Sequence, residues 1–218
     1  MAQLVWEIDL SQCSDGLFHE WLEAEMAACL DSEDARVVLL SWSGEAPAPE
    51  AIPPGFLRYL TLFELPVIVA FEGALFGPLT ELALAADVRI CSEGASLQGR
   101  LSGNARIRSL TDESTALALF LGRTAVPAPE LLRAGLVSIV TPRGGALAVA
   151  RRVAGVIASR GPIATRFAKE AIWRGLGQPL EQALRFETDL TLLLQTTKDR
   201  AEGVRAFMEK RPPIFTGD

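Results

Sequence analysis

Glu81 is the residue of this 218-residue chain whose surroundings point most directly to chemistry. It follows a corner formed by Gly77 and Pro78, and it stands one turn into an apolar helix predicted over 79–86. Glycine permits a tight turn, and proline suits the first helical position, where its missing N–H costs nothing. Burial disfavours the charged form of a carboxylate, so Glu81 is a candidate general acid or base. The alternative is a glutamate that only stabilises the positive end of the helix.

Cysteine, histidine and metal chemistry are disfavoured by the number and spacing of the residues. Cys13, Cys29 and Cys91 form no CxxC pair, and we expect buried free thiols in a reducing compartment. A nucleophilic cysteine needs a histidine partner, but the single histidine, His19, falls in a helical stretch. A tetrahedral zinc site lacks ligands, and the GxSxG turn of serine hydrolases is missing. We therefore expect no metal and no cysteine or serine nucleophile.

The charge balance disfavours nucleic acid as a partner. The chain has 27 acidic and 21 basic side chains, a formal net charge of −6, whereas phosphate-backbone binding requires a basic surface. Arg100, Arg106 and Arg108 form a local cluster that is a candidate contact for a phosphate or an acidic carrier protein, the alternative being solvated surface charge. No apolar run reaches the roughly 18–20 residues of a membrane span, and no basic leader is evident. We expect a cytoplasmic protein without a membrane partner.

The elements that must position these residues follow an α/β pattern. Apolar, β-prone runs predict strands, the first with period-two alternation and the later ones buried on both faces. These runs cover 4–10, 37–42, 67–71, 88–91 and 137–140. Helical spacing dominates afterwards, over 146–158, 162–174, 179–195 and 199–210. We predict an α/β core over 1–142 and a helical segment over 143–218, long enough to pack on the core or reach a neighbouring subunit.

Three passages resemble one known family. Residues 64–90, ELPVIVAFEGALFGPLTELALAADVRI, resemble without gaps the signature lPviaavnGxaxGGGxELalacDxria of the crotonase (enoyl-CoA hydratase/isomerase) superfamily. The stretch from FLGR at 120–123 to AGLV at 134–137, and the ending EKRPPIF at 209–215, also resemble family passages. The chain is thereby identified as a shortened and diverged member of this superfamily.

The resemblance implies a fold, a substrate class and an assembly. The fold is a spiral ββα core with a C-terminal helical trimerisation region, and the assembly a homotrimer or hexamer. The substrate is an acyl thioester of coenzyme A or of a carrier-protein pantetheine arm, with no separate cofactor. Family members stabilise a thioester enolate with two backbone N–H groups, an oxyanion hole, and hydratases add two glutamates that activate water and protonate carbon.

Only part of that hydratase machinery matches this sequence. Glu81 falls on the first family glutamate, whereas Leu101 occupies the position of the second. One oxyanion donor is the middle glycine of GGG, which is Pro78 here and has no N–H. Gly77 or Leu79 would then have to donate instead. The resemblance therefore predicts a single acid/base and an altered oxyanion hole.

The remaining family sites fall in loops and in the tail. The second oxyanion donor belongs to a loop that carries Ser43 and Gly44 in this chain and departs from the family's aGaDl pattern. The resemblance places the nucleotide end of coenzyme A near Arg58 and near Lys210 and Phe215 of the tail. The alternative for each is an ordinary surface charge or a packing aromatic.

Two functions follow from this partial match. The first is enolate chemistry on an acyl thioester with Glu81 as the single acid/base, which favours dehydration, isomerisation or decarboxylation over ordinary hydration. The second is a catalytically inactive crotonase-fold protein that binds an acyl thioester or serves as a scaffold subunit. The loss of one oxyanion donor typically costs about 10²–10³ in turnover, which motivates the second function.

Overall fold

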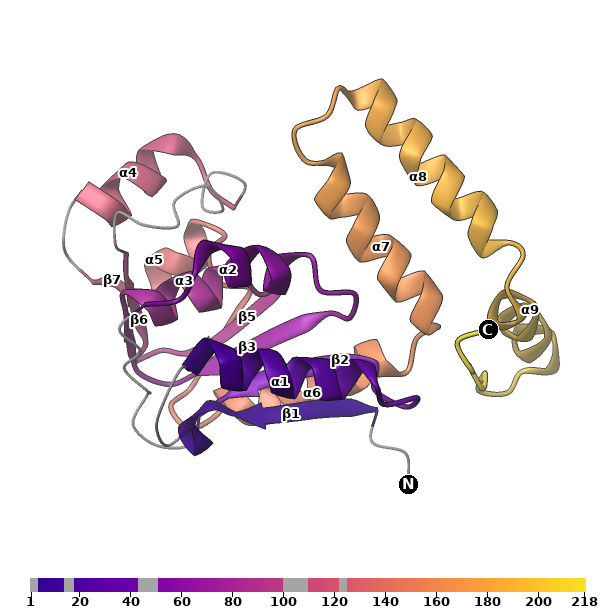
Figure 1. Ribbon diagram of the computed structural model, residues 1–218, viewed down its shortest axis with the longest axis horizontal. Coiled ribbons are helices and arrows are strands. Elements are labelled where there is room, and N and C mark those ends of the chain that lie inside the picture. Colours follow the sequence, from indigo (N-terminus) through magenta and orange to yellow (C-terminus); the bar gives the residue numbers. More distant parts are fainter. Residues whose placement is uncertain (1–3, 14–17, 43–50, 100–109, 122–124) are drawn as a thin grey trace.

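A parallel sheet forms the centre of the protein, as the apolar runs predict. The computed structural model describes residues 4–13, 18–42, 51–99, 110–121 and 125–218 (Figure 1). Within these residues, a five-stranded sheet has the order β1-β2-β3-β5-β8, with every neighbouring pair parallel. The strands are β1 (Val5–Asp9), β2 (Val37–Ser41), β3 (Val67–Phe71), β5 (Val88–Ser92) and β8 (Ile139–Thr141). The predicted α/β class is confirmed.

Both faces of this sheet are buried, because successive side chains of a strand point to opposite faces. In β2, Val38 and Leu40 belong to one core cluster, whereas Val37 and Leu39 belong to the other. The first cluster includes buried residues of α1 (Phe18–Leu30), α2 (Pro54–Thr61) and α3 (Pro78–Ala85). The second is closed by α6 (Ala146–Ala158), whose buried alanines recur every fourth residue at 146, 150, 154 and 158.

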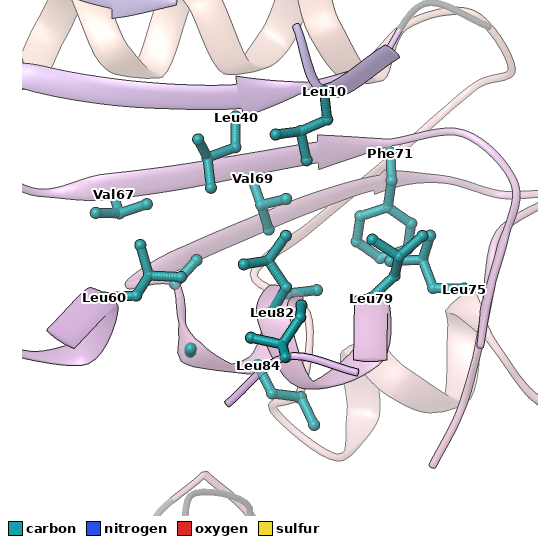
Figure 2. Close-up of a cluster of buried hydrophobic side chains, with 14 of the residues drawn as sticks. Leu10, Leu40, Leu60, Val67, Val69, Phe71, Leu75, Leu79, Leu82 and Leu84 are labelled. Carbon is teal, nitrogen blue, oxygen red and sulfur yellow. The ribbon is translucent and has the colours of Figure 1, made fainter. Parts of the chain in front are cut away.

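A second, smaller sheet follows β3 and holds the Gly77 corner. Its strands are β4 (Ala74–Phe76), β6 (Ser96–Gln98) and β7 (Val126–Pro127), with β4 parallel and β7 antiparallel to β6. The chain therefore runs β3, β4, α3 and back to β5, a ββα turn of the expected spiral. Figure 2 shows Leu79 and Leu82 of α3 in one buried cluster with Val69 and Phe71 of β3. The short strands of this sheet were not predicted.

The other short elements connect these layers. A 3₁₀ turn directly follows β1, helix α4 lies between β6 and β7, and helix α5 lies between β7 and β8. Their bounds are η1 (Leu10–Gln12), α4 (Glu113–Leu121) and α5 (Ala128–Arg133).

Three further helices end the chain: α7 (Pro162–Gly175), α8 (Leu180–Leu194) and α9 (Lys198–Glu209). We call residues 162–218 the C-terminal arm, and Figure 1 shows its α7–α8 hairpin extending away from the sheet. Helix α6 packs on the sheet, so the part that projects from the core begins at α7. The predicted division into a core over 1–142 and a helical segment over 143–218 stays a prediction. The arm exposes large apolar side chains: Leu176, Leu180, Leu184, Leu192, Leu193, Val204, Phe207, Met208 and Ile214. None of the helices in the described residues has the length and apolar character to span a membrane.

Candidate active site

The Gly77 corner turns the chain from β4 into α3. Gly77 precedes the helix with φ 52° and ψ −121°, a conformation that side-chain-bearing residues rarely adopt. Pro78 takes the first helical position, as the sequence predicts. The carbonyl of Gly77 accepts a hydrogen bond from the Glu81 amide at 3.3 Å, which closes the first turn. The corner therefore fixes where the first turn of α3 lies.

A threonine fastens this first turn to both neighbouring strands. Thr80 is fully buried, and its hydroxyl lies 3.0 Å from the carbonyl oxygen of Leu75 in β4 and 2.9 Å from that of Gln98 in β6. A buried hydroxyl held between two carbonyls resists displacement of the turn. Sequence reasoning passed over Thr80, because its partners come from strands too short to predict.

Glu81 lies one residue further, on the same turn. Its side chain is only 9% exposed, and the neighbouring Leu79 and Leu82 are buried. The predicted burial of this carboxylate is therefore present in the fold. The first backbone N–H groups of a helix have no acceptor within it, so those of Leu79 and Thr80 stand at the positive end of α3 beside the Glu81 turn. A carboxylate and amide donors on one turn are the two components that enolate chemistry requires.

Glu72 holds the turn between β3 and β4, and it was missed by sequence reasoning. Its carboxylate accepts from the backbone amides of Gly144 at 2.9 Å and Ala146 at 3.0 Å, and thereby caps the start of α6. Its own carbonyl accepts from the hydroxyl of Ser92 at 2.6 Å. These bonds tie the loop before the Gly77 corner to α6 and β5.

Several expected positions lie outside the described residues. These are the loop donors Ser43 and Gly44, the second-glutamate position Leu101, and the basic cluster Arg100, Arg106 and Arg108. Their roles stay predictions.

Arg58 lines a cavity of about 680 Å³ between the end of α2 and helix α7. Phe63, Lys169, Trp173 and Arg174 also line it, whereas Glu81 does not. Two of the lining residues, Lys169 and Trp173, contact the carboxylate of Asp87, which follows the end of α3. The cavity therefore lies toward the end of α3 opposite to Glu81.

Lys210 and Phe215 lie elsewhere again, in the tail after α9. Lys210 ends α9 in a left-handed conformation, φ 52° and ψ 41°. Phe215 is half-buried beside Gly161 and Gly203, and its carbonyl accepts from the Arg36 guanidinium at 2.6 Å. Within one chain, neither residue lines the Arg58 cavity. Their contact with coenzyme A stays a prediction that involves a neighbouring subunit.

Two of the three thiols have the buried environment that the sequence predicts, whereas Cys13 is only half-buried. Cys29 and Cys91 are buried free thiols, and burial raises the pKa of each to about 11. A thiol with such a pKa is almost entirely protonated at neutral pH and is a poor nucleophile. Among the described residues, no group of three His, Cys, Asp or Glu is placed to hold a metal ion.

Comparison with known proteins places this chain in a family. Residues 55–218 match the family described as enoyl-CoA hydratase/isomerase. The chain is 32% identical over 213 residues to (E)-benzylidenesuccinyl-CoA hydratase of Thauera aromatica, covering 84% of this chain and 82% of that protein. It is 35% identical over 175 residues to a protein named probable enoyl-CoA hydratase 2, mitochondrial, of Arabidopsis thaliana, where the match covers 74% of this chain but only 58% of the relative.

Solved structures agree with this placement. An enoyl-CoA hydratase from Bacillus anthracis superposes with a TM-score of 0.85 at 30% identity, covering 97% of this chain and 91% of that one. An enoyl-CoA hydratase homologue from Streptomyces coelicolor superposes with a TM-score of 0.88 over 100% and 93% of the two chains, and its 24% identity bears on the fold alone. The chain thus has the crotonase fold and belongs to the enoyl-CoA hydratase/isomerase family.

Proposed function

We propose that this protein acts on an acyl thioester, presented by coenzyme A or a carrier protein, with Glu81 as its single acid/base. The observation that carries the proposal is the position of Glu81, a buried carboxylate on the first turn of α3, directly after the Gly77 corner. Membership of a family whose named relatives are acyl-CoA hydratases supports the substrate class.

The chemistry requires one carboxylate to move one proton. Glu81 removes a proton from the carbon next to the thioester carbonyl, and the electron pair left behind forms the enolate. In isomerisation the same carboxylic acid returns the proton at the far end of the allylic system. In dehydration it gives the proton to the departing hydroxyl group, which leaves as water. Both steps balance without a second glutamate. In decarboxylation the bond to the carboxylate breaks, CO₂ leaves, and protonated Glu81 supplies the proton to the resulting enolate. We favour these three reactions over ordinary hydration, for which family hydratases use a second glutamate to activate a free water.

The enolate oxygen needs backbone donors, and Pro78 supplies none. We assign the first donor to the amide of Leu79, the second helical residue, whose N–H has no acceptor in the helix. The positive end of α3 adds to the stabilisation of an anion there. The second donor would come from the loop that carries Ser43 and Gly44.

The arm supports an assembly, which we propose to be a homotrimer or a hexamer. Its exposed leucines on α8, and Phe207 and Met208 on α9, are large apolar side chains of the kind that subunit contacts bury. Sedimentation should then give three or six times the chain mass of 23.5 kDa. A monomer at micromolar concentration contradicts the assembly but leaves the chemistry of Glu81 open to its own test.

A panel of enoyl-, 3-hydroxyacyl- and β-carboxyacyl-CoA thioesters tests the activity, with wild type and Glu81→Gln compared on each. We expect turnover of at least one substrate and its loss in the variant. Glu130→Gln is the matched control, because Glu130 is also a first-turn glutamate but is exposed on α5. Full turnover by Glu81→Gln contradicts the mechanism.

Pro78 also motivates a second function, an inactive subunit that only binds acyl thioesters or supports an assembly. Tight binding of acyl-CoA without turnover across the panel favours this role. Turnover that depends on Glu81 excludes it.

A further inference from the structure

Helix α7 attaches to the core through polar contacts. None of its 14 residues, all of which the structure describes, is buried. Six of its residues line the cavity of about 680 Å³ that lies between this helix and the end of α2. Ten of its residues are half-buried and four are exposed, so apolar burial holds the helix less firmly than it holds the core helices, and the polar bonds to the core contribute more to its position.

Two of those bonds converge on one carboxylate. Lys169 and Trp173 stand one helical turn apart, and both reach Asp87, which follows the end of α3. The Lys169 ammonium lies 2.6 Å from Asp87 Oδ2, and the Trp173 indole N–H donates to Oδ1 at 3.0 Å. Lys169 also donates to the Leu65 carbonyl at 2.9 Å. Residues i and i+4 share a helix face, so these three bonds from one side of α7 meet just before β3 and just after α3.

The carboxylate itself is fixed to the core. Asp87 Oδ2 accepts from the Val67 amide at 2.8 Å, so the oxygen that contacts Lys169 also caps β3. The side chains of Asp87 and Lys169 are 15% and 9% exposed. Removing one partner from such a pair leaves the other with a poorly solvated charge, which is strongly unfavourable. By contrast, the second ion pair of α7, Arg166 with Glu64, is 45% and 62% exposed and contributes little.

We infer that Asp87 is the positioning residue that sets the α7–α8 hairpin against the core. Asp87 lies two residues after α3, the helix whose first turn carries Glu81, so one short helix connects the candidate site to the arm. The tail has its own attachment through Arg36 and Phe215, which leaves the hairpin as the part that depends on Asp87. The consequence for assembly rests on the proposed function, because it assumes that the arm carries the subunit contacts.

Hydrogen–deuterium exchange of the full-length protein tests the inference. Asp87→Asn, Lys169→Met and Trp173→Phe should each speed exchange in α7 and α8, at least tenfold for the first two and less for the third. Exchange in β1 and β2, which make no bond to Asp87 in the described residues, should stay within twofold of wild type. Glu64→Gln is the matched control, because it removes the exposed ion pair with Arg166 of the same helix, and it should leave both regions unchanged. Trp173→Phe removes the indole donor and part of the ring but leaves the Lys169–Asp87 charge pair intact, so it guards against misfolding of the charge variants.

A second readout separates this inference from the proposed assembly. If wild type is an oligomer, Asp87→Asn and Lys169→Met should raise its dissociation constant at least tenfold, whereas Glu64→Gln should not. If wild type is a monomer, the proposed assembly is wrong, and hydrogen–deuterium exchange alone tests the role of Asp87. Unchanged exchange in α7 and α8 of Lys169→Met and Asp87→Asn overturns the inference, as does equal loss of protection in the sheet and the hairpin.

Discussion

The carboxylate of Glu72 accepts a hydrogen bond from the backbone amide of Ala146 at 3.0 Å, across 74 residues of sequence. The bond joins the loop that leads into the Gly77 corner to the first turn of α6, and a second bond from the Gly144 amide at 2.9 Å reinforces it. A side chain from outside the helix thus serves as the N-terminal cap that α6 otherwise lacks, since Gly145 offers no capping side chain.

Replacing this cap should destabilise the protein. Glu72→Ala removes an acceptor from two amides, and loss of a helix cap typically costs about 0.5–2 kcal/mol. We expect a fall of that size in the free energy of unfolding, measured by urea titration. Glu93→Ala, an exposed glutamate at the end of β5, should change it by less than about 0.5 kcal/mol. Equal stability of Glu72→Ala and wild type contradicts the capping role.

The Gly77 corner should not tolerate a side chain. Alanine at φ 52° and ψ −121° is strained, and such strain costs on the order of 1–3 kcal/mol. Gly77→Ala should therefore unfold at lower temperature and lose turnover through displacement of the Leu79 amide. Gly73→Ala serves as the control, because a Cβ at Gly73 meets no atom within 4 Å. Similar melting temperatures for the two variants would show that the corner can relax.

The tail should loosen in acid. Arg211 donates to both carboxylate oxygens of Glu202 at 2.6 and 3.0 Å, and the Ile214 amide donates at 3.0 Å. These hydrogen bonds lower the pKa of Glu202 from 4.5 to about 2. Because the folded-state pKa is depressed, the stabilisation is present above pH 4.5 and is lost as the pH falls toward 2.

Exchange of the 211–218 amides should accordingly rise, beyond its intrinsic pH dependence, between pH 4.5 and 2. In Glu202→Gln the tail should already exchange rapidly at pH 6 and show no further loosening over that range. A pH-dependent loosening that persists in Glu202→Gln would assign the effect to another group.

Thiol labelling checks the two environments of the cysteines. Cys29 and Cys91 are buried with pKa values raised to about 11, whereas Cys13 is half-buried. At pH 8 a maleimide should modify Cys13 first, and the other two only when the protein unfolds. Rapid native-state modification of Cys91 would place it at an open surface. Mass spectrometry of peptic fragments distinguishes the three sites.

The sequence predicts those features that depend on neighbouring residues. Apolar runs locate the central strands, and the Gly77–Pro78 pair locates the start of α3, because glycine and proline act on local backbone geometry. The three-residue strands β4 and β6 carry no periodic signal, so the sheet that holds Thr80 was not predicted.

Contacts between distant residues were beyond prediction for a different reason. Asp87 and Trp173 are 86 residues apart, and nothing local to either residue indicates the other. Glu72 likewise reads as a loop residue until α6 is placed beside it. The sequence therefore predicts the part of the site around Glu81, which lies within one continuous motif. The hydrogen bonds that hold this part in place join distant residues and are seen only in the fold.

Glu81 is proposed to remove the proton next to a thioester carbonyl, and proton exchange measures that step without knowledge of the natural reaction. Wild type is incubated with butyryl-CoA and crotonyl-CoA in D₂O, and deuterium at the carbons next to and beyond the carbonyl is followed by NMR. We predict incorporation by wild type and Glu130→Gln, and a rate about 10²–10⁴-fold lower in Glu81→Gln. Incorporation at the wild-type rate in Glu81→Gln would contradict the account.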